Sequence, residues 1–211
     1  MHIKSNATKT STMVWYACYG SNMDFDRFLK YIKGGQLIVN GATKVYKACP
    51  TDTLPPRQSE SYSINRRFFF AKESTTWNKQ GVAFISNKKN KKSKTFGKLY
   101  LISKDQFSHL FAQENQRNVV EIDYAMLLRN DFLDFDYNFY NRIVILNKNY
   151  KGYPILTFTN KSTLPTNKPH FKYAQLIIYG LKQTHNLTSK EAISYLSKRG
   201  TGAKKIDLKE S

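Results

Sequence analysis

Two short stretches carry residue types that could perform chemistry together, the tetrapeptide Tyr19-Gly20-Ser21-Asn22 and the carboxylate of Glu114. The tetrapeptide follows an apolar run, Val14 to Cys18, that predicts a buried strand, and it precedes a helical pattern of apolar residues. A glycine turn between a strand and a helix N-terminus directs backbone N–H groups and the positive end of the helix dipole towards one point. The turn therefore favours an anion such as a carboxylate or phosphate, although the pattern also fits a tight turn that binds nothing.

The helix after this turn has both of its ends marked. A side-chain oxygen of Asn22 or Asp24 can cap its N-terminus, and the pair Gly34-Gly35 can end it. Its apolar residues recur at helical spacing, at Phe25, Phe28, Leu29 and Ile32.

Glu114 belongs to a second predicted helix, which begins at the capping box Ser103-Lys104-Asp105-Gln106 with Ser103 as N-cap and Gln106 at position N3. Phe107, Leu110 and Phe111 form the apolar stripe of this helix, and the next turn of the same face carries Glu114. Because an unpaired carboxylate on an inward face is costly, Glu114 is a candidate general acid or base. The alternative is a helix-end glutamate that is solvated or paired with a lysine.

The length of 211 residues fits a single domain, with a core at about residues 14–200, a polar lead-in and a polar tail. Two cysteines, Cys18 and Cys49, make neither a disulfide framework nor a metal site, and four histidines without a His-Asp cluster indicate no metal centre. A reduced, cytoplasmic setting is the simplest interpretation. No segment is long and apolar enough to span a bilayer.

The net charge is +19, from 34 basic and 15 acidic residues. Such a surface could bind nucleic acid or another polyanion. The charges are mostly dispersed lysines, whereas base recognition and bidentate phosphate contacts favour arginine, so a bias in composition is the preferred explanation. The basic run at residues 87–94 is accordingly expected to be a solvated hairpin loop and not a nucleic-acid-binding finger.

The remaining pattern predicts an α+β fold with a curled, largely antiparallel sheet. Strands are expected at residues 66–72, 81–86, 96–102, 142–146 and 153–159. Helices are expected at residues 121–131, 173–181 and 186–199, the last with Thr188 and Glu191 as a capping box and Gly200 as its end. Residues 36–65, which contain three prolines and many Ser and Thr, are expected to form a long irregular surface loop.

At these residues the sequence resembles the gamma-glutamylcyclotransferase family. The motifs that carry the resemblance are Tyr19-Gly20-Ser21-Asn22-Met23, Gly97-Lys98-Leu99-Tyr100 and Phe111-Ala112-Gln113-Glu114. The likeness covers about residues 14–200 and is greater to a bacterial branch that is often labelled "histone deacetylase". Further matches to that branch are Trp15, Arg27-Phe28, Gly34-Gly35, Pro55-Pro56-Arg57, Phe70-Ala71, Glu73-Ser74, Trp77, Gln106-Phe107 and Tyr153-Pro154. The resemblance implies a barrel-like, mixed or antiparallel sheet with flanking helices.

The resemblance also implies an activity, an intramolecular amide transfer of the transferase or lyase class that uses no cofactor. The α-amine of a γ-glutamyl group attacks its own γ-carbonyl, so that 5-oxoproline forms and an amine leaves. The family pattern assigns the acid/base role to Glu114 and substrate binding to the loop Tyr19-Gly20-Ser21-Asn22. Tyr100 and Tyr173 are further candidate lining residues, and core packing is an equally good explanation for both.

Two other functions stay open on the sequence. An enzyme of the same fold could bind or cleave a different small anionic conjugate or a signalling molecule. A basic protein with a vestigial pocket could instead bind nucleic acid or another anion. Cys18, where the family usually has a small residue, and Asn115, where it commonly has glycine, leave the substrate undetermined.

The basic run supplies a test of the charge. If the run is a solvated loop, deleting residues 89–92 is expected to leave catalysis and folding nearly unchanged. Turnover and melting temperature of the deletion variant at physiological salt measure this. A large loss of activity would indicate a polyanionic partner instead, and salt-dependent retention on DNA would support that conclusion.

Overall fold

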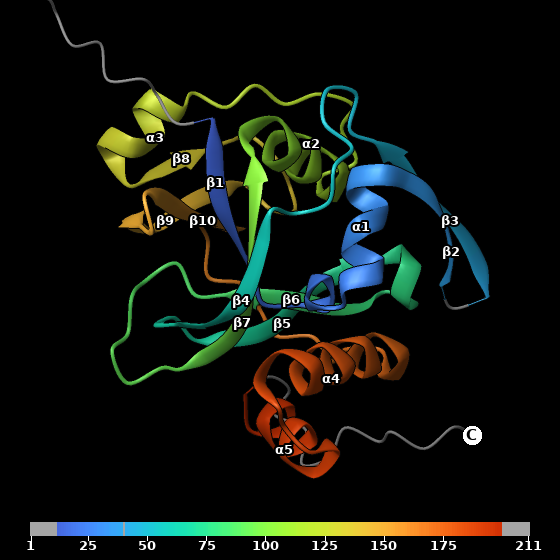
Figure 1. Ribbon diagram of the computed structural model, residues 1–211. Helices are drawn as coiled ribbons and strands as arrows, with labels where there is room; N and C mark the ends of the chain where they lie inside the picture. The colour runs from blue at the N-terminus through green and yellow to red at the C-terminus, as the bar shows by residue number, and fades with distance from the viewer. Residues whose placement is uncertain (1–11, 40, 200–211) are drawn as a thin grey trace, which may run out of the picture.

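The computed structural model describes residues 12–39 and 41–199. The expectations for the polar lead-in before residue 12, for Gly200 as a helix end and for the C-terminal tail lie outside these residues. Figure 1 shows a central sheet with helices packed around it.

Six strands form the central sheet, in the order β4-β7-β1-β10-β9-β8. Their bounds are β1 (Met13–Cys18), β4 (Gln58–Ile64), β7 (Thr95–Ser103), β8 (Phe132–Asp134), β9 (Arg142–Tyr150) and β10 (Tyr153–Thr159). All neighbours are antiparallel except β1 and β10, which run parallel. Val14 to Cys18 is buried at every position, as expected for a central strand that is covered on both faces.

Two short ribbons flank this sheet, one formed by β2 (Gly34–Val39) and β3 (Ala42–Ala48) and the other by β5 (Phe68–Ser74) and β6 (Gln80–Ile85). The expectation of an irregular loop over residues 36–65 is therefore wrong, because β3, β4 and most of β2 lie there. Strand β4 is polar, with Ile64 its one buried residue, so it shows no apolar alternation. Its backbone pairing with β7, which no local pattern reveals, makes it a strand.

The helices are α1 (Phe25–Lys33), α2 (Lys104–Glu114), α3 (Tyr124–Asn130), α4 (Phe171–His185) and α5 (Ser189–Arg199), with short 3₁₀ turns η1 (Ser21–Met23) and η2 (Thr75–Trp77). The predicted α+β class is confirmed. At α1, the Asp24 side chain accepts a hydrogen bond from Arg27 N, and Gly34 ends the helix at φ 76°. At α5, Glu191 accepts from Thr188 N and Thr188 Oγ1 accepts from Glu191 N, which is the predicted capping box.

Helix α4 packs against η1 and α5 at one end of the molecule, where Figure 1 draws it in orange. The two segments approach closely at Gly180, where a Cβ would lie 2.5 Å from Met23 Cβ. Only glycine fits there, so α4 can support the turn that follows β1.

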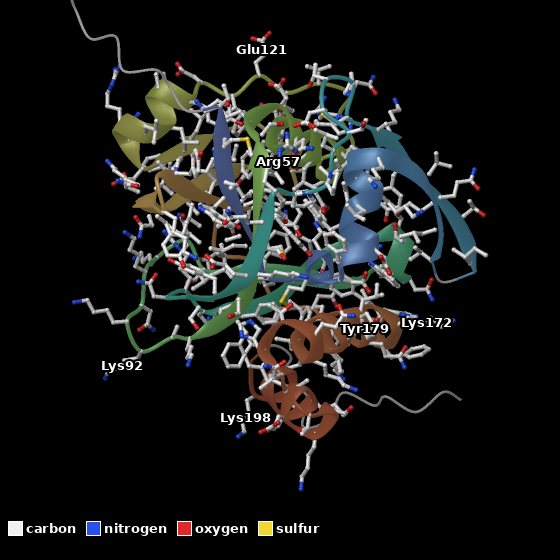
Figure 2. The ribbon with its side chains drawn as sticks, in the orientation of Figure 1. Arg57, Lys92, Glu121, Lys172, Tyr179 and Lys198 are labelled. Atoms are coloured by element: carbon white, nitrogen blue, oxygen red, sulfur yellow. The ribbon has the colours of Figure 1, made fainter. Side chains whose placement is uncertain are left out.

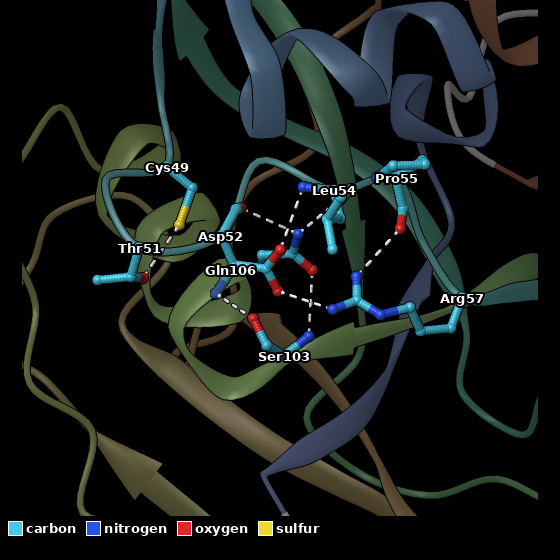
Figure 3. A network of polar contacts seen from close by, with 8 residues as sticks. All are labelled: Cys49, Thr51, Asp52, Leu54, Pro55, Arg57, Ser103 and Gln106. Carbon is cyan, nitrogen blue, oxygen red and sulfur yellow. Dashed lines mark hydrogen bonds and ion pairs between the residues drawn. The ribbon is translucent and has the colours of Figure 1, made fainter.

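Gln106 connects the start of α2 to the proline-containing segment before β4 (Figure 3). Its Oε1 accepts from Ser103 N at 3.1 Å, and Ser103 Oγ accepts from Gln106 N at 3.3 Å, which completes the predicted capping box. Its Nε2 also donates to the carbonyl oxygens of Asp52, at 3.0 Å, and Leu54, at 2.8 Å. Arg57 donates to the Asp52 carboxylate at 3.2 Å on the same segment. A residue expected only to cap a helix therefore also fixes a loop.

The basic run lies in the loop between β6 and β7 with its lysines exposed, so the predicted solvated loop is confirmed. It is not a hairpin loop, because β6 and β7 belong to different sheets. Lys92 projects away from the body of the molecule in Figure 2. Among the helices of the described residues, none has both the length and the apolar character needed to cross a membrane.

The double role of Gln106 generates a stability prediction. In Gln106→Glu, the carboxylate can still accept from Ser103 N, but it cannot donate, and it would face the carbonyl oxygens of Asp52 and Leu54. We expect a loss of about 1–3 kcal/mol, because the completely buried side chain at this position loses two donated hydrogen bonds and places a carboxylate against two carbonyl oxygens. Urea denaturation of the variant and the parent measures it. The matched control is Glu191→Gln in the exposed box of α5, where little change is expected; equal effects at both positions would contradict the prediction.

Candidate active site

The turn after β1 is held in a compact shape by its own backbone and by α4 and β6. Met23 N donates to Gly20 O at 3.1 Å, and Asp24 N donates to Ser21 O at 3.2 Å. A Cβ on Gly20 would lie 3.0 Å from Ala83 Cβ and 3.2 Å from Tyr173 Oη. A side chain at residue 20 would therefore push the turn away from its neighbours.

Glu114 is the last residue of α2 and lies beside this turn. Its helical stripe is inward, as predicted, since Phe107, Leu110 and Phe111 are completely buried. Asn22 Nδ2 donates to Glu114 Oε1 at 2.9 Å. The two stretches singled out in the sequence, which are 92 positions apart, are therefore joined by a direct hydrogen bond.

A cavity of about 350 Å³ opens at this contact. Its size suits a small molecule. Its lining comes from the turn, α1, β3, η2, β6, the end of α2, the segment at residues 137–140 and α4. It includes Tyr19, Gly20, Ser21, Asn22, Arg27, Lys44, Trp77, Ala83, Glu114, Tyr140 and Tyr173. Four predicted substrate-binding residues of the turn and Tyr173 thus line one cavity with Glu114, while their roles in binding or catalysis stay predictions.

Tyrosines surround the Glu114 carboxylate, and several have their hydroxyls tied to backbone groups. Tyr19 Oη donates to Phe158 O at 2.7 Å, Tyr140 Oη donates to Ala83 O at 3.1 Å, and Tyr173 Oη accepts from Ala83 N at 3.0 Å. Burial raises the pKa of all three hydroxyls and the Glu114 charge raises them further, to about 12 for Tyr173. These hydroxyls stay protonated at neutral pH.

Tyr100 occupies a different place from Tyr173. It is not among the residues that line the cavity. Its hydroxyl donates to Asn22 O at 3.1 Å and Met23 O at 3.3 Å, and its ring stacks on Phe28 with the centroids 4.0 Å apart. Tyr100 therefore supports the turn from the side of the core.

Arg27 is a cavity residue that the sequence reasoning did not select. It is only 6% exposed, and its Nε donates to Ser21 Oγ at 3.1 Å. Its Nη1 has no hydrogen-bond partner among the residues described, a state that costs about 1–3 kcal/mol for a buried polar group. Burial tends to lower the pKa of Arg27, but Tyr31, Tyr46 and Glu114 raise it to above its ordinary value, so the guanidinium stays charged. A signal existed in the sequence, since Arg27 lies one helical turn before Tyr31 and shares the buried face of the short helix with it.

Lys44 is a second cavity cation that was missed, because it lies on β3, in the segment expected to be a loop. Its Nζ lies 5.0 Å from the ring centroid of Tyr46 and 5.9 Å from that of Tyr31. Burial lowers the pKa of Lys44, while the Glu114 charge opposes that shift. Within the described ranges, no group of three or more His, Cys, Asp or Glu residues could hold a metal ion.

The fold is that of gamma-glutamyl cyclotransferase. A solved structure with that name superposes at a TM-score of 0.52, with 13% identity, over 90% of this chain and 89% of that chain. A crystal structure of an uncharacterised protein from Homo sapiens gives the same TM-score and identity over 95% of this chain and 94% of that chain. The resemblance in fold that the motifs predict is confirmed.

The sequence also has a curated relative. A segment of "Histone deacetylase 5" from Arabidopsis thaliana is 35% identical over 204 residues, which cover 88% of this chain and 30% of that protein. The relative carries the predicted "histone deacetylase" label and comes from a plant, whereas the motifs indicate a bacterial branch. This chain spans about 30% of the relative's length. No family model matches the sequence.

Cys18 lies directly before the turn, and its environment predicts an inert thiol. It is 1% exposed, its Sγ donates to Lys98 O at 3.3 Å, and burial raises its pKa to about 12. We expect native protein at pH 8 to resist alkylation at Cys18, as measured by mass mapping. We also expect Cys18→Ala to keep most activity and to lose about 1 kcal/mol of unfolding free energy through poorer packing.

The raised pKa of Cys18 also sets a pH dependence. Because the folded thiol holds its proton to a higher pH than the unfolded thiol, its contribution to stability is complete below the unfolded value of about 8.5 and is lost as pH rises towards 12. Cys18→Ala should therefore lose stability less steeply than the parent between about pH 9 and 11, which lies between these two pKa values. Rapid alkylation of native Cys18, or an inactive but folded Cys18→Ala, would contradict an inert role.

Proposed function

We propose that this chain is an enzyme that cyclises a γ-glutamyl group, releasing 5-oxoproline and an amine. The observation that supports this most is the contact between Asn22 Nδ2 and Glu114 Oε1 at 2.9 Å, on the wall of a cavity of small-molecule size. It brings one carboxylate against the Gly-Ser-Asn turn, as the chemistry of the motif requires. The fold alone does not specify an activity, so the proposal rests on this site.

The reaction is a transfer within one molecule. The α-ammonium group loses two protons as its nitrogen forms a bond to the γ-carbonyl carbon, which closes a five-membered lactam. The bond from that carbon to the leaving nitrogen then breaks. One of the two protons passes to the leaving nitrogen, and the second is released to solvent or is taken up by the departing amine. Atoms balance without water as a reactant or a second substrate, so the protein has to orient the chain and transfer protons.

Glu114 takes both proton-transfer steps in this scheme. Its carboxylate accepts a proton from the α-ammonium group and returns it to the leaving nitrogen. Asn22 holds one carboxylate oxygen through its amide, and this contact fixes the direction of the second oxygen. The buried wall around it reduces competition from solvent, which strengthens the electrostatic contacts of a bound ligand.

The carbonyl oxygen that becomes negative during attack needs a donor. Tyr173 suits this role because its Oη already accepts a hydrogen bond from Ala83 N, which orients the hydroxyl, and its pKa of about 12 keeps its proton in place. The backbone N–H groups of Gly20, Ser21 and Asn22 are the alternative donors. The partner of the site is a small molecule with a γ-glutamyl or similar anionic group.

Replacing Glu114 with Gln tests the proposal. The amide keeps the shape and can still contact Asn22, but it cannot exchange the proton, so we expect turnover to fall at least about 100-fold while substrate still binds. Release of 5-oxoproline from γ-glutamyl compounds measures turnover, and calorimetry measures binding.

Glu121→Gln is the matched control, because Glu121 is exposed and projects from the surface in Figure 2. It makes the same chemical change away from the cavity and should leave turnover unchanged. Turnover that survives in Glu114→Gln would remove the proposed acid/base role. A parent protein that releases no 5-oxoproline from any γ-glutamyl compound would end the proposal.

A further inference from the structure

The cavity contains one buried positive charge that is held in place by the turn itself. Arg27 Nε donates to Ser21 Oγ at 3.1 Å, which fixes the plane of the guanidinium beside the predicted binding residues. The ion pairs found in the described part of the chain do not include Arg27. A fixed cation without an ion-pair partner gives this side of the cavity a positive potential.

Asn22, the residue after Ser21 in the turn, provides an unpaired acceptor where Arg27 provides a donor. Asn22 Nδ2 donates to Glu114, while Asn22 Oδ1 is buried and has no hydrogen-bond partner within residues 12–39 and 41–199. Arg27 Nη1 is a buried donor that likewise has no hydrogen-bond partner in the described part of the chain. Asn22 and Arg27 both line the cavity. The unpaired acceptor on Asn22, which contacts Glu114, suits an ammonium group, and the unpaired donor on Arg27, which contacts Ser21, suits a carboxylate.

We propose that Arg27 is a specificity-determining residue, which selects ligands that carry a carboxylate next to the amine held by Glu114 and Asn22. The inference rests on the proposed function and adds to it the residue that recognises the α-carboxylate of the γ-glutamyl group. The carboxylate lies on the Arg27 side, the ammonium group lies on the Glu114 side, and the γ-carbonyl extends into the remainder of the cavity.

Other cations of the cavity are less suited to this task. Lys44 lies over the rings of Tyr31 and Tyr46 on the β2–β3 ribbon, and Arg117 lies 5.1 Å from the ring centroid of Tyr137 at the end of α2. Arg117 is exposed and Lys44 is half-buried. Neither has a hydrogen bond to the turn among those found in the described residues, so neither has the fixed position that Arg27 has.

The test compares two ligands and several variants. One ligand is a γ-glutamyl anilide, and the other is the 4-aminobutanoyl anilide, which lacks only the α-carboxylate and can still close a lactam ring. Binding of both is measured by calorimetry in Glu114→Gln, so that no turnover is needed, with Arg27 intact or changed to Met. Turnover of both is measured separately with Glu114 in place.

With Arg27 intact, we expect the carboxylate-bearing ligand to bind about 10- to 100-fold more tightly, the range for a hydrogen bond to a charged group. In Arg27→Met the preference should fall to about 2-fold or less, because the charge is gone while the apolar stem remains. Arg27→Gln, which keeps a donor for Ser21, should lose the preference too and serves if the Met variant does not fold. Lys33→Met, on an exposed side chain of the same helix, removes one charge and should keep the preference.

Any of four results would overturn the inference: an unchanged preference in both Arg27 variants, loss of the preference in Lys44→Met with Arg27 intact, no preference in the parent background, or no binding of the carboxylate-bearing ligand. If the preference depends on Arg27 but the parent releases no 5-oxoproline, the inference stands and the cyclisation fails, so the two outcomes are distinguishable.

Discussion

A carboxylate at the C-terminal end of a helix is the constraint on which this site depends. Glu114 is the last residue of α2, where the partial negative charge of the helix carbonyls disfavours an anion. The cost has to be offset by donors and cations from elsewhere. Asn22 supplies a hydrogen bond, and Arg27 and Lys44 supply positive charge within the same cavity. The turn after β1, the first turns of α1 and the ribbon strand β3 therefore all converge on one side chain.

The tyrosines make this convergence rigid. Tyr19, Tyr140 and Tyr173 carry their hydroxyls against backbone groups of β10 and β6, so their rings are positioned by strands. Tyr100 fixes the turn from the core side, because its hydroxyl donates to Asn22 O. A cavity built on regular elements holds its geometry more accurately than one built on loops, and reactions that depend on orientation benefit from that accuracy.

The parts of the site that could be predicted are those encoded by local spacing. The buried run before Gly20, the capping box at Ser103 and the stripe that ends at Glu114 each follow from the period of one element, and they placed the turn and the carboxylate correctly. The parts that could not be predicted depend on pairing between distant segments. Nothing near Lys44 shows that its strand faces the cavity, and nothing near Tyr100 shows that its hydroxyl points to Asn22 O from behind.

Strand β4 and Gln106 show the same limit for the fold. The polar strand forms because β7 offers backbone partners, and the second role of Gln106 appears only when the segment at Asp52 and Leu54 folds against it. In both cases the local sequence has an ordinary alternative, a loop or a simple cap. Tertiary contacts decide between the alternatives.

The parallel pairing of β1 with β10 has a consequence for when the cavity can assemble during synthesis. The first strand stands between β7 and the last strand, and Thr157 Oγ1 reaches back to Ala17 O across 140 positions. Strand β1 must therefore wait for residues that are synthesised about 140 positions later, and α4 must follow before Gly180 can meet Met23. Such long loops close slowly. The turn after β1 therefore cannot form the cavity on its own, and no fragment that ends before α4 contains the complete cavity lining.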